Sequence, residues 1–239
     1  LVMGEDGEHA GGIAGGIPTS IGNLTNLETM DFRNAGLTGQ VPSEVASLPK
    51  IRRVKLGNNE LTSLPENSWN SPDLYQIDMP YNLLTSIPNE IAKISSLEWL
   101  ALGGNNLRDL NFLSHDEVNL PNLYLLNVSN QEIPIDNGGL QGEIPDIFSQ
   151  LPKLEDLSLG HNNLSGPIPD SMWSLPELRT LSLYGNQLTG ELSPLMWESE
   201  NKLDNLKLQD NAFSGVIPED FCLLGDASNN CQGENPNDQ

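Results

Sequence analysis

The sequence predicts an α/β-type solenoid built on a parallel β-sheet of about eight strands. One phrase recurs along the chain, as Leu-Gln-Gly-Glu-Ile-Pro at 140–145, Leu-Ser-Gly-Pro-Ile-Pro at 164–169 and Phe-Ser-Gly-Val-Ile-Pro at 213–218. Each copy follows a segment in which apolar residues alternate with polar ones. Such alternation is typical of a half-buried strand, and a strand that recurs with a return segment at a fixed period is typical of a solenoid.

The predicted strands open on apolar residues that lie 23 to 31 positions apart. These residues are Leu27, Ile51, Leu74, Leu97, Leu123, Leu154, Leu178 and Leu203. In the repeat that starts at Leu178, the alternation directs Leu181 and Leu183 into the core and Thr180, Ser182 and Tyr184 outward.

The two ends differ from the repeats between them, which divides the chain into three segments. Residues 1–26 form an irregular N-terminal segment with a half repeat, 27–221 hold eight repeats, and 222–239 are a C-terminal cap and polar tail. The first strand then has an uncovered edge through which copies could associate end to end. Cys222 and Cys231 flank the end of the solenoid and, in an exported protein, are expected to form a disulfide, with free thiols or a partner-directed bond as the alternatives.

An asparagine follows the strand in six of the eight repeats. These residues are Asn59, Asn82, Asn105, Asn162, Asn186 and Asn211. A buried amide can satisfy the backbone groups of a turn, so the pattern predicts an internal asparagine ladder. Ala35 and Gln131 stand at this position in the other two repeats, where we expect the ladder to be interrupted.

The repeat pattern L-x-x-L-x-L-x-x-N-x-L, followed by Leu-x-Gly-x-Ile-Pro, resembles the plant-type subclass of the leucine-rich repeat family. Plant receptor kinase ectodomains and polygalacturonase inhibitors carry such repeats. The phrases Leu-Thr-Ser-Leu-Pro at 61–65 and Leu-Thr-Ser-Ile-Pro at 84–88 are closer to the typical or bacterial subclasses, which favours a secreted or surface protein of a microbe. The resemblance implies a right-handed superhelix with a concave parallel sheet, an extracellular or cell-surface location, and ligand binding on the concave face.

The composition argues against several classes of function. The chain has 33 acidic and 11 basic residues and a formal net charge of −22, which repels nucleic acid. It has no apolar run of the roughly 20 residues that would span a bilayer, so we expect no membrane insertion. The three histidines have no nucleophile at a recognisable spacing, and no phosphate-binding loop or metal-ligand cluster is present. We therefore expect no enzyme activity, no cofactor and no metal.

Two groups of residues stand out among those that the concave face would display. One is a local excess of basic side chains around the first two repeats, which could bind an acidic peptide or glycan or pair with neighbouring acids. The other is a set of aromatic residues on repeats three to five, a composition typical of interface hot spots or of partial burial under loops. The predicted binding residues are Arg33, Arg53, Lys55, Tyr75, Asp78, Tyr81, Trp99, Tyr124, Asn127, His161 and Tyr184.

Irregular repeats lie beside the aromatic residues. Repeat four is stretched at 108–117 and repeat five carries extra residues at 133–139. Such insertions form loops that often lie on the binding face, although surface loops also lengthen without functional consequence. Trp69, Trp173 and Trp197 occupy the return segments, where we expect packing on the convex side.

These observations predict a non-catalytic extracellular module that recognises a protein or carbohydrate through its concave face. The alternatives are a structural spacer or adhesin segment of a larger surface protein, or an inhibitor of a secreted hydrolase. Three sequons, at Asn23, Asn127 and Asn163, are candidate glycan acceptors in a eukaryotic protein.

Overall fold

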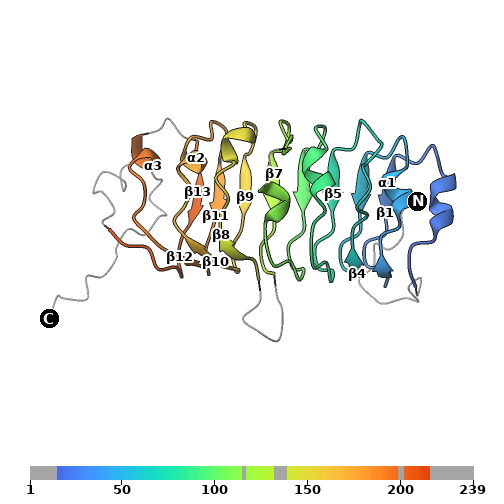
Figure 1. The fold of residues 1–239 in the computed structure, drawn as a ribbon, viewed down its shortest axis with the longest axis horizontal. Helices are drawn as coiled ribbons and strands as arrows, with labels where there is room; N and C mark the ends of the chain where they lie inside the picture. The colour runs from blue at the N-terminus through green and yellow to red at the C-terminus, as the bar shows by residue number, and fades with distance from the viewer. Residues whose placement is uncertain (1–14, 115–116, 132–138, 199–201, 216–239) are drawn as a thin grey trace.

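A computed structural model describes residues 15–114, 117–131, 139–198 and 202–215 as an elongated stack of coils (Figure 1). The main sheet has eight parallel strands, one from each predicted repeat. In spatial order they are β1 (Thr29–Asp31), β3 (Arg53–Lys55), β5 (Gln76–Asp78), β6 (Trp99–Ala101), β7 (Leu125–Asn127), β9 (Asp156–Ser158), β11 (Thr180–Ser182) and β13 (Asn205–Lys207). The predicted fold class is therefore confirmed, and every strand begins two residues after its predicted apolar opener.

Two smaller parallel sheets lie along one long edge of the stack, below the main sheet in Figure 1. Their strands are β2 (Thr38–Gln40), β4 (Glu60–Ser63), β8 (Gln141–Glu143), β10 (Asn163–Gly166) and β12 (Gln187–Leu188). β2 pairs with β4, and β10 lies between β8 and β12. The recurring glycine of the phrase adopts a positive φ, as at Gly39 (77°) and Gly142 (82°), a conformation that favours glycine.

Short helices cover one face of the main sheet, in front of it in Figure 1. They are η1 (Thr19–Asn23), α1 (Ser43–Ala46), η2 (Asn89–Lys93), η3 (Asn111–Leu113), η4 (Phe148–Gln150), α2 (Asp170–Trp173) and α3 (Leu195–Glu198). Pro18, Pro42, Pro88 and Pro169 stand at the N-caps of four of them, where an extended backbone turns the chain into the helix. Among the described residues, no helix is long and apolar enough to cross a membrane.

The core runs along the axis of the solenoid between the main sheet and the return segments. The central residue of each strand points into it, as Val54, Ile77 and Leu100 do with no exposed surface. The stretched repeat four differs from the expected surface loop. Phe112 and Leu113, in η3, are buried in the core, and η3 packs beside η2 on the return side. The part of that insertion that the structure describes is therefore not a loop of the concave face.

The predicted amide ladder is present in the turns that follow seven of the eight strands of the main sheet, all but β1. Asn105, which is 1% exposed, shows the pattern: its Nδ2 donates to Leu102 O (2.8 Å) and to Met79 O of the preceding repeat (3.0 Å). Its Oδ1 accepts from Leu84 N, also of the preceding repeat (3.0 Å). One side chain thus satisfies backbone groups in two successive coils.

The predicted interruption of the ladder at Gln131 is wrong. Gln131 Nε2 donates to Leu102 O (3.0 Å) and its Oε1 accepts from Leu107 N (3.1 Å), which are the two inter-repeat bonds that an asparagine makes elsewhere. Glutamine has one methylene more than asparagine, and the longer side chain chooses a different partner within its own repeat. Its Nε2 donates to Ser129 O (3.1 Å), two residues earlier, whereas an asparagine of the ladder donates to the carbonyl three residues earlier. Ala35 contributes no amide, but its backbone N donates to Asn59 Oδ1 (3.1 Å).

The predicted packing of the return-segment tryptophans is seen for two of the three residues. Trp173 is buried at 2% exposure and Trp69 packs partly against the core, as expected for convex-side packing. The side chain of Trp197 and the pair Cys222 and Cys231 lie outside the described residues, so the disulfide stays a prediction. The segment boundaries and the end-to-end association also stay predictions.

Replacement of Asn105 by alanine should lower the free energy of unfolding by about 3 kcal/mol, because Met79 O, Leu102 O and Leu84 N would each lose a buried partner. Urea unfolding followed by circular dichroism measures the change. Asn89→Ala, at an exposed position, is the control. Equal shifts for the two variants would contradict the ladder's structural role.

Candidate functional site

The strand register arranges the outward residues of the concave face, the face away from the short helices, in rows that run across the strands. Two rows come from the strands themselves, because the first and third residues of every strand pair with their equivalents in the next. The first row is Thr29, Arg53, Gln76, Trp99, Leu125, Asp156, Thr180 and Asn205, and the second is Asp31, Lys55, Asp78, Ala101, Asn127, Ser158, Ser182 and Lys207.

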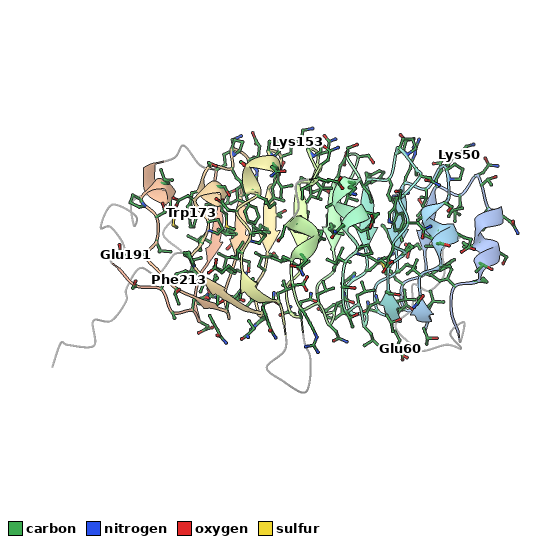
Figure 2. The ribbon with its side chains drawn as sticks, in the orientation of Figure 1. Lys50, Glu60, Lys153, Trp173, Glu191 and Phe213 are labelled. Carbon is green, nitrogen blue, oxygen red and sulfur yellow. The ribbon has the colours of Figure 1, made fainter. Side chains whose placement is uncertain are left out.

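Two further rows border the face. The entry row, just before the strands, is Glu28, Arg52, Tyr75, Glu98, Tyr124, Glu155, Arg179 and Asp204, linked by backbone hydrogen bonds from each repeat to the previous one. The exit row, in the turns after the strands, is Asn34, Asn58, Tyr81, Gly104, Asn130, His161, Gly185 and Asp210. In Figure 2, Lys50 and Lys153, which precede their strands in the sequence, lie along one long edge of the molecule, and Glu60, which follows a strand and its turn, lies along the other.

Basic residues of the entry side are held by acids or amides of the neighbouring repeats. Arg52 lies 3.9 Å from Glu28 and 3.6 Å from Asp73. Arg179 lies 3.6 Å from Glu155 and 3.4 Å from Asp204. These contacts are the cross-strand pairing that the sequence left open, and exposed pairs of this kind contribute little to stability.

The lysines just outside the entry row follow the same rule. Lys50 Nζ donates to Asn26 Oδ1 (2.7 Å), and Lys153 Nζ donates to Asn122 Oδ1 (2.7 Å). Each lysine thereby spans one repeat step along the edge.

The basic residues inside the face behave differently. Among the described residues, Arg53 and Lys55 have no carboxylate oxygen within 4.0 Å, and Arg53 Nε donates to the hydroxyl of Thr29 (3.1 Å). Arg33 instead forms a two-bond pair with Asp31 of its own strand, with both distances 2.8 Å. Arg53 and Lys55 therefore present cationic groups to a ligand without first having to break an ion pair with this chain.

The two aspartates around Lys55 have opposite pKa shifts. The hydrogen bond from Arg33 is the main cause that lowers the pKa of Asp31. Burial raises the pKa of Asp78, although the nearby charges of Lys55 and Arg33 act in the lowering direction. The basic neighbours of Asp78 therefore offset only part of the cost of burying its charged carboxylate.

Three of the four aromatic residues predicted on repeats three to five occupy neighbouring positions at the entry side: Tyr75, Trp99 and Tyr124, with Tyr81 as the fourth. Trp99 and Tyr124 meet edge to face, with ring centroids 6.0 Å apart and an interplanar angle of 79°. Burial, followed by the charges of Glu98 and Glu155, raises the pKa of Tyr124, so its phenol is a neutral hydrogen-bond donor at physiological pH. Trp99 Nε1 is buried and has no partner among the described residues.

Tyr81 lies apart from this group, in the exit row. All eight members of that row have a φ between 51° and 67°, and most are Asn, Asp or Gly, which tolerate the left-handed conformation. Tyr81 (φ 54°) is 61% exposed, and its ring lies over Gly104 of the next repeat, where an added Cβ would come within 2.5 Å of it. A bulky residue in this conformation is strained, and exposed strain of this kind is common at functional sites.

A second ring pair in the exit region was not predicted as a contact. His161 (φ 51°) meets Tyr184 edge to face at 4.5 Å. The rings fit because Gly160 lies beneath Tyr184 and Gly185 lies beside His161, where an added Cβ would come within 2.9 Å of an imidazole nitrogen. Gly160 occupies the position of Tyr184 in the neighbouring repeat, and Gly185 occupies that of His161, and these two glycines were the signal in the sequence.

Asn127 lies in the second row, between the two aromatic regions. Its Oδ1 accepts from the backbone N (3.0 Å) and the hydroxyl (2.7 Å) of Ser129. With Ala101 and Ser182 almost fully buried in the same row, the middle of the face is a strip of small side chains.

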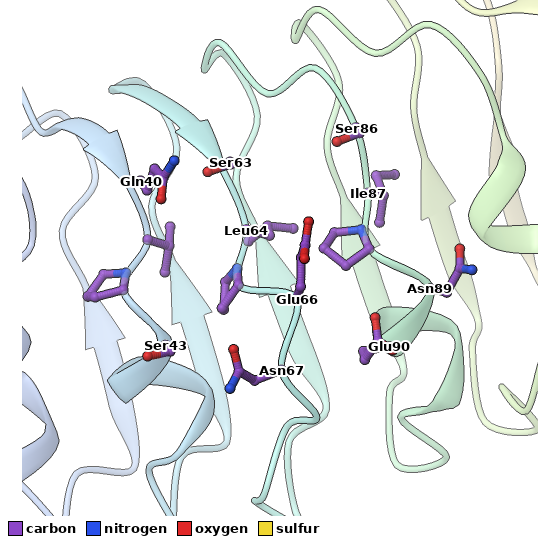
Figure 3. A pocket seen from close by; sticks show the side chains of 14 residues that line it. Gln40, Ser43, Ser63, Leu64, Glu66, Asn67, Ser86, Ile87, Asn89 and Glu90 are labelled. Carbon is purple, nitrogen blue, oxygen red and sulfur yellow. The ribbon is translucent and has the colours of Figure 1, made fainter.

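The flank of the molecule is also hollowed. One groove crosses the return segments of repeats one to three, and its lining includes Pro42, Pro65 and Pro88, which have equivalent positions in the three repeats. Figure 3 shows Ser63, Leu64 and Glu66 in the middle repeat of this groove. Its lining includes Glu66 and Glu90 but no basic or aromatic side chain. The groove lacks the residue types that dominate interface energetics, so the concave face is the better candidate for a site.

Comparison with known proteins defines the class. The leucine rich repeat family model matches residues 49–107 and 121–188, and a further leucine rich repeat model matches 202–224. The chain belongs to the leucine-rich repeat family. It is 30% identical over 144 residues to Receptor-like protein 39 of Arabidopsis thaliana, which covers 59% of this chain and 15% of that protein.

Solved structures give the same picture. A plant peptide hormone receptor, RGFR1 in complex with RGF2, superposes with a TM-score of 0.74 at 28% identity, over 86% of this chain and 32% of that one. The ectodomain of the receptor kinase GASSHO1/SCHENGEN3 from Arabidopsis thaliana, in complex with CASPARIAN STRIP INTEGRITY FACTOR 2, gives 0.67 at 31% identity, over 87% and 27%. The chain spans less than a third of the length of each of these relatives.

Replacement of Asp78 by asparagine should raise the unfolding midpoint at pH 7, because the raised pKa means that the folded state disfavours the charged carboxylate. The gain should shrink as the pH falls through the raised pKa, where the native residue becomes protonated. Thermal unfolding across pH 4 to 7 measures it.

Asp31→Asn is the matched control with the opposite sign. The lowered pKa of Asp31 means that its charge stabilises the fold above the unfolded-state value of about 3.9, and this contribution is lost only at more acidic pH. This variant should therefore lower the midpoint at pH 7. Shifts of the same sign in both variants would contradict the assignment.

Tyr81→Asn should raise the unfolding midpoint, since asparagine adopts the left-handed conformation at a cost lower by about 1 kcal/mol. The reverse change in the preceding repeat, Asn58→Tyr, should lower it, because the next exit position then holds Tyr81 and not a glycine. Destabilisation by the first variant with no effect of the second would show that Tyr81 is not strained.

Proposed function

We propose that this domain is a non-catalytic extracellular module that binds a protein or peptide through its concave face. The observation that carries the proposal is the combination, on one face, of the basic residues Arg53 and Lys55, which have no carboxylate oxygen within 4.0 Å in the described part of the chain, with the ring pair of Trp99 and Tyr124. Aromatic and arginine anchors supply most of the binding energy in protein interfaces.

The charge of the face defines the chemistry of the partner. Arg53 and Lys55 favour a segment that carries carboxylates, and the rings of Trp99 and Tyr124 favour an apolar or aromatic side chain beside it. The Tyr124 phenol adds a hydrogen-bond donor. A protein segment that combines an acidic with an apolar residue satisfies all three groups.

The rigidity of the solenoid makes modest contacts effective. Binding ordinarily costs the ordering of side chains and loops, but here the amide ladder and the sheet already hold the rows in register. The solved relatives, one a peptide hormone receptor in complex with RGF2 and the other a receptor ectodomain in complex with CASPARIAN STRIP INTEGRITY FACTOR 2, support an extracellular, protein-binding role.

The test is a binding screen of the isolated domain against extracellular proteins, peptides and acidic and neutral glycans. A protein or peptide hit should weaken at least tenfold in Trp99→Ala and in Arg53→Glu, since an interface anchor contributes 1–2 kcal/mol or more. Lys50→Glu, which makes the same charge change on the entry edge, is the control and should bind as the native domain does.

Circular dichroism confirms that each variant is folded. Hits confined to glycans would replace the protein partner with a carbohydrate. Hits that are indifferent to Trp99→Ala and Arg53→Glu would remove the concave face as the site and favour a structural spacer.

A further inference from the structure

The three sequons lie in three different structural settings. Asn23 ends η1 on the helix-covered side, Asn127 lies in β7 on the concave face, and Asn163 begins β10 in a minor sheet. The surroundings of each asparagine determine whether the folded protein has room for a glycan on its side chain.

The setting of Asn127 is unfavourable to a glycan. The Asn127 side chain is half-buried and fixed by two hydrogen bonds from Ser129, so the hydroxyl of the sequon bonds the amide of the same sequon. The amide also lies against the preceding strand, 3.2 Å from where a Cβ on Gly103 would stand. A glycan here would cover the middle of the concave face.

The setting of Asn163 is intermediate. Asn163 lies in the central strand of a three-stranded sheet, half-buried, with Gln141 opposite it in β8. Its Oδ1 accepts a hydrogen bond from Gln187 in β12. The side chain is therefore enclosed by polar neighbours on both sides.

The setting of Asn23 differs from both. Its side chain is exposed and makes no hydrogen bond among the described residues, and Thr25 is also exposed. Backbone bonds from Leu24 N to Ile21 O (3.0 Å) and from Leu27 N to Leu24 O (2.8 Å) hold the sequon in a tight surface turn. Leu24, the middle residue of the sequon, is 47% exposed, one of the few large apolar side chains on the described surface.

We infer that Asn23 is an N-glycosylation site, and that its glycan lies on the helix-covered side and leaves the concave face open. In the reaction the amide nitrogen loses a proton and bonds to C1 of the first sugar of a lipid-linked oligosaccharide, and the lipid diphosphate leaves. The attached sugars would lie next to Leu24 and reduce its exposed apolar surface. The inference rests on the extracellular part of the proposed function, not on the identity of the partner.

The test is secretion of the domain from a eukaryotic cell line behind a heterologous signal peptide. Enzymatic release of N-glycans converts an occupied asparagine to aspartate, which peptide mass spectrometry locates. We expect Asn23 to be occupied in the folded, monomeric fraction. Thr25→Ala should abolish the modification, and Thr25→Ser, which preserves the sequon, should retain it.

The absence of a glycan on Asn23 in the secreted, folded protein would overturn the inference. Binding supplies an independent readout: Asn23→Gln should lose the glycan and keep the affinity for any partner found, whereas Trp99→Ala should lose affinity and keep the glycan. A loss of affinity in Asn23→Gln would instead contradict the statement that the glycan lies away from the binding face.

Discussion

The amide ladder is the interaction on which the rest of this structure depends. Every coil must turn from the main sheet toward the return segment, and the turn buries backbone groups that a neighbouring strand cannot reach. A single side chain, such as Asn105, bonds two carbonyls and one N–H from two successive coils. Because an unpaired buried group costs about 1–3 kcal/mol, the ladder also fixes the spacing and register of the coils. The same geometry recurs from Asn59 to Asn211, so each repeat is locked onto the one before it.

The concave face follows from that register. Once successive strands pair residue for residue, side chains at one offset in the sequence form a straight row, and chemistry separated by a whole repeat becomes contiguous. The ring pairs are diagonal neighbours in such adjacent rows: Trp99 meets Tyr124, and His161 meets Tyr184, each one position away from its exact counterpart in the next coil. The same constraint forces the exit row into the left-handed conformation, so the chain bears strain where it places Tyr81 and not asparagine. The register of the coils thus accounts both for the rigidity of the concave face and for the strained backbone at Tyr81.

The sequence predicted the period, the parallel sheet, the start of every strand and the nature of the ladder, because each depends on repeated local patterns. It did not predict that Gln131 continues the ladder, since the extra methylene is accommodated by a different carbonyl in its own turn. Nor did it predict that Phe112 and Leu113 enter the core, because a lengthened repeat can return to register by adding a helical turn. The contact between His161 and Tyr184 was missed for a related reason. It depends on glycines one repeat away, as Tyr184 depends on Gly160, and such dependence is visible only after the coils are aligned.

The concave face carries basic side chains, whereas the molecule as a whole has a strongly negative net charge. The chain carries a formal net charge of −22, yet Arg53 and Lys55 lie on the concave face without a carboxylate partner among the described residues. For the acidic partner that we propose, the net charge gives repulsion at long range, and attraction arises only on contact with these two basic side chains. At physiological ionic strength the screening length is about 8 Å, which suppresses the long-range repulsion more than the contact attraction. Under the proposed function, recognition on this face depends on close fit, and the ring pair of Trp99 and Tyr124 supplies the part of that fit that salt does not weaken.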